Sequence, residues 1–204
     1  MKTLGMVTLL VSAWLAGCNQ YGDKQRAWTE DVILDDGTAL VIERSVHFTD
    51  HNSLAQDSYG ADEKDATLKF TGAQATLPAW SAPLIPMVLY RAAQTNDWVI
   101  VATTSSCELW YERGAPIPPY WEFRIVQGKW REIALTPQSI GQKTNLFLSY
   151  HPGLPAKHVT MQVKRQYWSD ERTARKYQQV LSADETLPYC GYWSPPKLPL
   201  NKTD

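Results

Sequence analysis

The sequence predicts a mainly β fold, an antiparallel sandwich or open barrel with one C-terminal helix. Three observations support this prediction. Apolar and polar residues alternate along most of the chain, turn residues separate short apolar runs, and a helical period appears only near the C-terminus. Many short strands followed by one helix are typical of sandwiches and barrels. No repeat of about 40 residues is sustained, which argues against a propeller.

The first predicted hairpin joins Val32-Ile33-Leu34 to residues 38–48 through Asp35-Asp36-Gly37. Asp-Gly between two apolar runs predicts a type I′ turn, which needs positive φ at both central positions. The apolar residues that share one face of the second strand are Leu40, Ile42, Val46 and Phe48. Because side chains alternate across a strand, this face is expected to be core, although Arg44 interrupts it.

Further strands are predicted at residues 66–71, 84–93, 98–103, 120–126, 130–135, 145–150 and 159–168. Pro86 lacks a backbone donor and therefore requires an edge or a bulge at the start of its strand. Asn96-Asp97 predicts a second hairpin between the strands that it separates. Gln127-Gly128-Lys129 predicts a third hairpin in the same way.

After residue 168 the spacing of apolar residues changes from the period of two, typical of strands, to a helical period. Ser169 can cap a helix whose first turn holds Asp170 and Glu171. The apolar residues at helical spacing are Ala174, Tyr177, Val180 and Leu181. The sequence therefore predicts one helix ending near Ser182, followed by an extended proline-rich tail at residues 194–204.

The first residues have the pattern of an export signal. Lys2 precedes an apolar run at residues 4–16, which is shorter than the roughly 20 residues that span a bilayer. The following Leu15-Ala16-Gly17-Cys18 resembles the lipobox of bacterial lipoproteins. This resemblance implies that residues 1–17 are removed and that Cys18 becomes the lipidated first residue.

A lipidated Cys18 would attach the protein to the lipid bilayer, because two or more acyl chains give stable anchoring. Asp after the lipidated cysteine is the usual inner-membrane retention signal, and this chain has Asn19 there. The resemblance thus implies an outer-membrane lipoprotein that faces the periplasm. The expected organisation is a signal peptide at 1–17, a lipidated linker at 18–27, a single β-rich domain at 28–193 and the tail at 194–204.

The charge balance bears on possible partners. The whole chain has 20 basic and 21 acidic residues, and removal of Lys2 with the signal leaves a formal charge of −2. No basic field is present to hold a phosphate backbone, so nucleic acid is not an expected partner.

With Cys18 assigned to lipid, Cys107 and Cys190 remain, and an even pair in an oxidising compartment predicts a disulfide. The alternatives are a catalytic thiol or two metal ligands. Neither has local support, because no histidine lies within several residues of either cysteine and no Cys-x-x-Cys is present.

The familiar catalytic motifs are absent from the sequence. It has no Gly-x-Gly fingerprint, P-loop, Gly-x-Ser-x-Gly elbow or His-Glu-x-x-His. His47 and His51 with Asp50 are weak candidates for a metal site, since two imidazoles and a carboxylate can hold zinc or copper. The alternative is two solvated histidines in a polar loop at residues 49–60. No cofactor is expected.

Aromatic residues are abundant, with nine tryptophans and ten tyrosines in the chain. Aromatic rings stack on sugars or fill partner pockets, so peptidoglycan or an envelope protein is the expected partner. Trp98, Trp121 and Trp130 lie in strand patterns and are expected in the core. The candidates for ligand contact lie beside prolines or loops: Trp110, Tyr111, Tyr120 and Trp193.

Two segments, residues 28–37 with the Trp28-Thr29-Glu30-Asp31-Val32 start and residues 120–130 from Tyr120 to Trp130, are similar to uncharacterised proteobacterial lipoproteins. That resemblance implies no activity. The sequence thus favours a non-enzymatic binding or scaffolding lipoprotein of the cell envelope. The alternatives are an exclusion or inhibitor lipoprotein that blocks an incoming protein or enzyme, and an envelope hydrolase with an unrecognised site.

Overall fold

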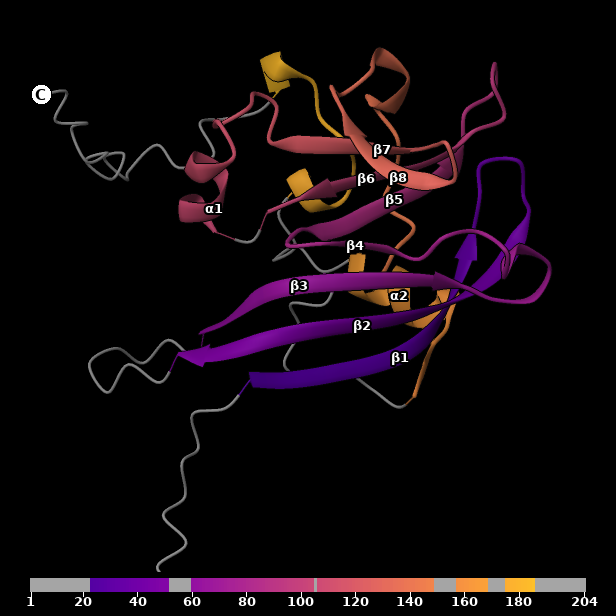
Figure 1. Cartoon of the computed structure of the whole chain (residues 1–204), viewed down its shortest axis with the longest axis horizontal. Coiled ribbons are helices and arrows are strands. Elements are labelled where there is room, and N and C mark those ends of the chain that lie inside the picture. The colour runs from indigo at the N-terminus through magenta and orange to yellow at the C-terminus, as the bar shows by residue number, and fades with distance from the viewer. Residues whose placement is uncertain (1–22, 52–59, 105, 149–156, 169–174, 186–204) are drawn as a thin grey trace, which may run out of the picture.

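The computed structural model describes residues 23–51, 60–104, 106–148, 157–168 and 175–185. These residues form two β-sheets with two short α-helices, so the predicted mainly β fold is confirmed. Figure 1 shows the two sheets as separate layers, one built from the first strands of the chain and the other from β5 to β8. The arrangement is that of a β-sandwich, and the sheets do not close into a barrel.

The first sheet has the order β4-β3-β2-β1-β9. Its strands are β1 (Asp23–Ile33), β2 (Ala39–His51), β3 (Gly60–Phe70), β4 (Trp80–Ala82) and β9 (His158–Val159). The second sheet has the order β5-β6-β7-β8. Its strands are β5 (Ile85–Arg91), β6 (Trp98–Thr103), β7 (Tyr120–Val126) and β8 (Lys129–Ile133). All pairs are antiparallel except β1 with β9, which is parallel.

The main core lies between the two sheets. It combines Ile42 and Leu68 of the first sheet with Leu89 and Ile100 of the second, and all four are buried. The aromatic rings of Trp80 and Phe123 meet edge to face with 5.4 Å between centroids. This face of β2 is the one that the alternating pattern predicted, and Arg44 does lie buried on it.

Strands β5 and β6 of the second sheet are buried on both faces. A second apolar cluster includes Met87, Val101 and Leu148, together with Val180 from the C-terminal part of the chain. This double burial explains the uninterrupted apolar sequences of β5 and β6, because a strand covered on both faces does not alternate.

The predicted hairpins are confirmed, but one turn differs from its prediction. Between β1 and β2 only Gly37 has positive φ, at 82°, and Leu34 N–H donates to Thr38 C=O across a three-residue loop. The type I′ prediction for Asp36-Gly37 is therefore wrong. Positive φ at both central positions occurs instead between β7 and β8, where Gln127 has 52° and Gly128 has 72°.

The helices lie elsewhere than predicted. Helix α1 (Cys107–Glu112) was not predicted, although Ser106 caps it by accepting from Leu109 N–H. Helix α2 (Met161–Trp168) occupies the strand predicted at residues 159–168, of which only β9 is extended. In the range predicted as helix, Arg175–Tyr177 is a single 3₁₀ turn and Gln179 forms a β-bridge with Lys143, while residues 169–174 lie outside the described structure.

Residues 145–148 are also not a strand, in contrast to the prediction for 145–150. Their backbone bonds go to isolated partners, such as Leu146 N–H to Met87 C=O, instead of a continuous ladder. Strand β2 also continues to His51, so the loop predicted from residue 49 begins later.

Strand β1 begins at Asp23, so the predicted linker at 18–27 is wrong from Asp23 onward. Residues 1–22 and the tail at 194–204 lie outside the described structure. Within the ranges that the structure describes, no helix is long and apolar enough to cross a membrane.

Candidate functional site

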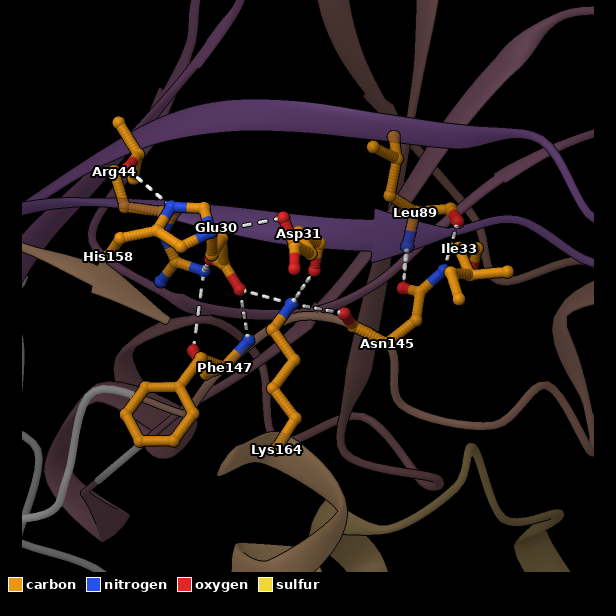
Figure 2. Close-up of polar contacts among 10 residues, drawn as sticks. Glu30, Asp31, Ile33, Arg44, Leu89, Asn145, Phe147, His158 and Lys164 are labelled. Carbon is orange, nitrogen blue, oxygen red and sulfur yellow. Dashed lines mark hydrogen bonds and ion pairs between the residues drawn. The ribbon is translucent and has the colours of Figure 1, made fainter. Parts of the chain in front are cut away.

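Three fully buried charged side chains meet beside strands β1 and β2 of the first sheet (Figure 2). Glu30 of β1 accepts from Arg44 of β2 at 3.1 Å through Oε1. The ammonium of Lys164, on α2, lies 2.5 Å from Oε2 of the same carboxylate. Isolated buried charges are costly, and the carboxylate of Glu30 compensates the two cations, whereas Arg44 acts on Lys164 in the opposite direction.

Backbone groups complete this ion cluster. Lys164 Nζ donates to the carbonyls of Asp31 at 2.6 Å and Asn145 at 2.7 Å. Glu30 Oε2 also accepts from Phe147 N–H at 2.7 Å. Burial lowers the pKa of Lys164, and the carboxylate of Glu30 acts in the opposite direction. The cluster thereby fastens α2 and residues 145–147 to the first sheet.

Arg44 is less completely paired than its partners. Its Nε and Nη2 are buried without a hydrogen-bond partner among the residues described. The guanidinium instead lies over the ring of Trp28, 5.2 Å from its centroid, in a cation–π contact. None of the three charged residues lines either of the two cavities described below, so we assign the cluster a role in positioning chain segments.

The side chain of Asn145 forms the hydrogen bonds that a neighbouring strand would form at the edge of β5 (Figure 2). Its side-chain oxygen accepts from Leu89 N–H at 2.8 Å, and its Nδ2 donates to Leu89 C=O at 2.7 Å. The same Nδ2 donates to Ile33 C=O at 3.1 Å, which links the two sheets. One amide therefore occupies this part of the β5 edge.

A second buried carboxylate, Glu122, is held on β7. Its oxygens accept from Arg124 Nε at 2.8 Å, Thr136 N–H at 2.8 Å and Ser139 Oγ at 2.7 Å. Burial raises the pKa of Glu122, but these hydrogen bonds outweigh it and hold the pKa below its ordinary value. The group therefore remains ionised and fixes the segment that follows β8.

Two of the four aromatic candidates, Tyr120 and Trp110, are buried, although Tyr120 also lines the groove described below. Tyr120 is 2 % exposed, and its hydroxyl donates to Lys176 C=O at 3.0 Å. Trp110 is 7 % exposed and donates from Nε1 to Pro116 C=O. These hydrogen bonds hold Trp110 against the loop before β7 and Tyr120 against the segment around Lys176.

Tyr111 is half-buried and packs against the ring of Trp110, with 4.8 Å between centroids. Trp193 lies outside the described residues. Of the tryptophans predicted in the core, Trp121 is buried, whereas Trp98 and Trp130 are half-buried at its rim.

The histidine pair receives no support as a metal site from the residues described. His47 Nδ1 lies 3.0 Å from Asp65 Oδ2 on the neighbouring strand β3. The side chain of His51 is outside the described part of the structure. No group of three or more histidine, cysteine or carboxylate side chains comes together among the side chains that are described.

The cysteine predictions remain open. Cys107 is the first residue of α1, whereas Cys18 and Cys190 lie outside the described residues. The lipid attachment at Cys18 and the disulfide between Cys107 and Cys190 therefore stay predictions.

An apolar groove of about 650 Å³ lies between the loop before β7 and the segment after β8. We call it the isoleucine groove, after Ile117, Ile133 and Ile140, which line it together with several prolines. Ile117 is 66 % exposed and Ile140 is 36 % exposed, so its apolar walls are open to solvent. The sequence contains one signal for this groove, the run Pro116-Ile117-Pro118-Pro119. The prolines around Ile117 disfavour a strand there, so the isoleucine is not expected in a sheet.

The groove offers little aromatic surface. Tyr120 and Trp121 also line it, but Tyr120 is 2 % exposed. The guanidinium of Arg113 lies 5.1 Å from the Trp121 ring centroid and forms an ion pair with Glu132. A second cavity, of about 560 Å³, lies beside Asp35, Asp36 and Tyr90. Hydrogen bonds from Thr38 lower the pKa of Asp36, the opposite direction from that of a general acid.

Comparison with known proteins finds no matching family model, no matching curated protein and no matching solved structure. The class that the observations define is a mainly β protein with an open apolar groove.

Proposed function

We propose that this protein is an outer-membrane lipoprotein, anchored through Cys18, that binds another envelope protein at its periplasm-facing domain. The binding surface is the isoleucine groove. The observation that carries this proposal is the exposure of Ile117, 66 % of which is open to solvent on a wall of that groove. Exposed aliphatic residues beside a concave surface are typical of protein-binding sites.

The composition of the groove favours a protein over a glycan. Sugar rings bind best to open aromatic faces, but Tyr120 and Trp110 are buried and Arg113 lies over Trp121. The open side chains are aliphatic instead, and they suit apolar side chains of a protein partner. The role is therefore binding or scaffolding, without catalysis by the chain itself.

The test is site-specific photo-crosslinking in intact cells that express the lipidated protein. A photoreactive residue at position 117 should capture one stoichiometric envelope protein, and Ile140→Asp should abolish this product. Val126→Asp is the matched control, because Val126 is 47 % exposed but does not line the groove. Cys18→Ala should release the protein from the membrane fraction.

The opposite outcome is equally clear. If position 117 captures no protein while the purified chain turns over cell-wall fragments, the binding proposal is wrong and the hydrolase alternative replaces it. A membrane-bound Cys18→Ala variant would contradict the lipid anchor.

A further inference from the structure

Strand β8 is the last strand of the second sheet, and the register of its hairpin shows which of its backbone groups face outward. The two-residue turn makes Val126 and Lys129 a hydrogen-bonded pair, and the alternation of antiparallel ladders makes Arg124 and Arg131 the next. Trp130 and Glu132 therefore direct their N–H and C=O away from β7. Neither residue has a backbone hydrogen bond to any other described segment.

The other sheet edges are covered in part or are very short in the part of the chain that the structure describes, and β9 covers only Thr29 and Glu30 of the 11-residue β1. β9 pairs with β1, Asn145 occupies the edge of β5, and β4 has only three residues. An open edge is a template for another strand, and proteins normally cover or disrupt such edges. β8 thus offers an unpaired edge from Lys129 to Ile133.

The isoleucine groove adjoins this edge. Glu132 and Ile133 belong to β8 and also line the groove. Side chains of an added strand would alternate between its two faces, so every second residue could reach the apolar walls. Hydrogen bonding at the edge and apolar contact in the groove would then act on the same ligand.

The charges on β8 indicate which kind of partner strand would pair with it. Lys129 and Arg131 are exposed, lie two residues apart on one face of β8, and form no ion pair among the described residues. A second copy of this chain is a poor partner, because self-pairing centred on Arg131 would place two cations opposite each other. Acidic residues opposite Lys129 and Arg131 would instead be favourable.

We propose that the partner binds as an added β-strand on β8, through an extended segment in which apolar and acidic residues alternate. This is the mode of strand addition, in which main-chain bonds supply affinity and side-chain pockets supply specificity. The inference rests on the proposed function, since it specifies how the groove engages its protein partner.

The experiment uses the full chain and a synthetic peptide, acetyl-Val-Asp-Val-Asp-Val-Asp-Val-amide, with amide hydrogen exchange followed by NMR. Binding should slow exchange at Trp130 and Glu132 and leave Arg131, already bonded to β7, unchanged. Arg131→Glu should weaken binding about fivefold or more, since it replaces a favourable cross-strand pair by a like-charge pair. Lys143→Glu, at an exposed lysine outside β8, should not change the affinity.

A version of the peptide that is N-methylated at its valines provides the chemical control, because it keeps the side chains but loses the donors along the edge that would face Trp130 and Glu132. Strand addition requires that this version bind at least about fivefold more weakly. Equal binding of the two peptides, no binding of the parent peptide, or unchanged exchange at Trp130 and Glu132 would overturn the inference. If crosslinking at position 117 succeeds in those cases, the proposed function stands and only the binding mode is wrong.

Discussion

Lys164 Nζ and Glu30 Oε2 lie 2.5 Å apart, and both side chains are fully buried. The contact joins a short polar helix to the first strand across 134 positions of sequence. It belongs to a cluster in which two cations share one carboxylate, so both cations depend on Glu30 for their compensation. The integrity of this end of the sandwich therefore depends on electrostatics as well as apolar packing.

The first prediction concerns Lys164→Met. This substitution removes one of the two cations paired with Glu30 and leaves the carbonyls of Asp31 and Asn145 without their donor, so it should lower the free energy of unfolding by about 2–4 kcal/mol. Chemical denaturation at pH 7 provides the measurement. Arg165→Met is the control, because Arg165 is the exposed neighbour on the same helix and its loss should cost less than about 0.5 kcal/mol. Equal effects of the two substitutions would contradict the assigned role of Lys164.

The second prediction concerns the pH dependence that Glu122 produces. Its pKa is lowered in the folded protein from an ordinary value of 4.5, so its contribution to stability is present above pH 4.5 and is lost as the pH falls through the folded pKa. Glu122→Gln should cost about 2 kcal/mol at pH 7. Denaturation curves of both proteins between pH 7 and pH 3 should show this difference shrinking below pH 4.5. A constant difference over that range would rule out the ionised Glu122 as its source.

The third prediction concerns Asn145 as a cap on the β5 edge. Asn145→Ala leaves the N–H and C=O of Leu89 without their partner, so the free energy of unfolding should fall by about 2–3 kcal/mol. Amide exchange at Leu89 should accelerate well beyond that of the β5 amides bonded to β6. Lys143→Ala, an exposed change two residues away, should leave Leu89 exchange as it is. Unaltered protection in the Asn145 variant would show that the cap is dispensable.

The fourth prediction concerns the turn at Gln127-Gly128. Gln127 has a φ of 52°, a conformation that asparagine tolerates better than glutamine and that β-branched residues resist. Thermal unfolding should show Gln127→Asn to be more stable by about 0.5 kcal/mol and Gln127→Val to be less stable by about 1–2 kcal/mol. A Gln127→Val variant as stable as the parent would mean that this turn adopts another conformation in solution.

Much of the sandwich could be predicted because the relevant signals are local. The alternation along β2 and the turn residues around Gly37 and Gly128 depend on neighbours within a few positions. The type of each turn is harder to predict from the sequence. Loop length decides it, and the sequence Asp35-Asp36-Gly37 permits either a two-residue or a three-residue loop.

The C-terminal region was mispredicted for a different reason. Apolar and polar residues alternate over residues 159–165 as in a strand. However, Lys164 is buried, where it pairs with the Glu30 carboxylate and donates to Asp31 C=O, and it lies on helix α2. Asn145 likewise replaces strand pairing by side-chain bonds. These partners lie more than 50 residues away, so a local pattern carries no information about them.

The candidate binding surface was only partly foreseeable. The proline-rich run at residues 116–119 marks an unusual segment, but the sequence predicts that the aromatic residues beside it form its exposed part. Tyr120 and Trp110 are buried by segments that the sequence does not place, and Ile117 is left exposed instead. Exposure is a tertiary property, which explains why the aliphatic residue was missed.

The early start of β1 has a mechanical consequence. From Asp23 onward the strand is paired with β2 along its whole length. A pull applied at Asp23 along the strand would act across the hydrogen bonds, which lie perpendicular to the strand direction, and would load them together in shear. If Cys18 holds the chain to a membrane, a force from a bound partner that acts along β1 would be resisted by the whole β1–β2 ladder at once.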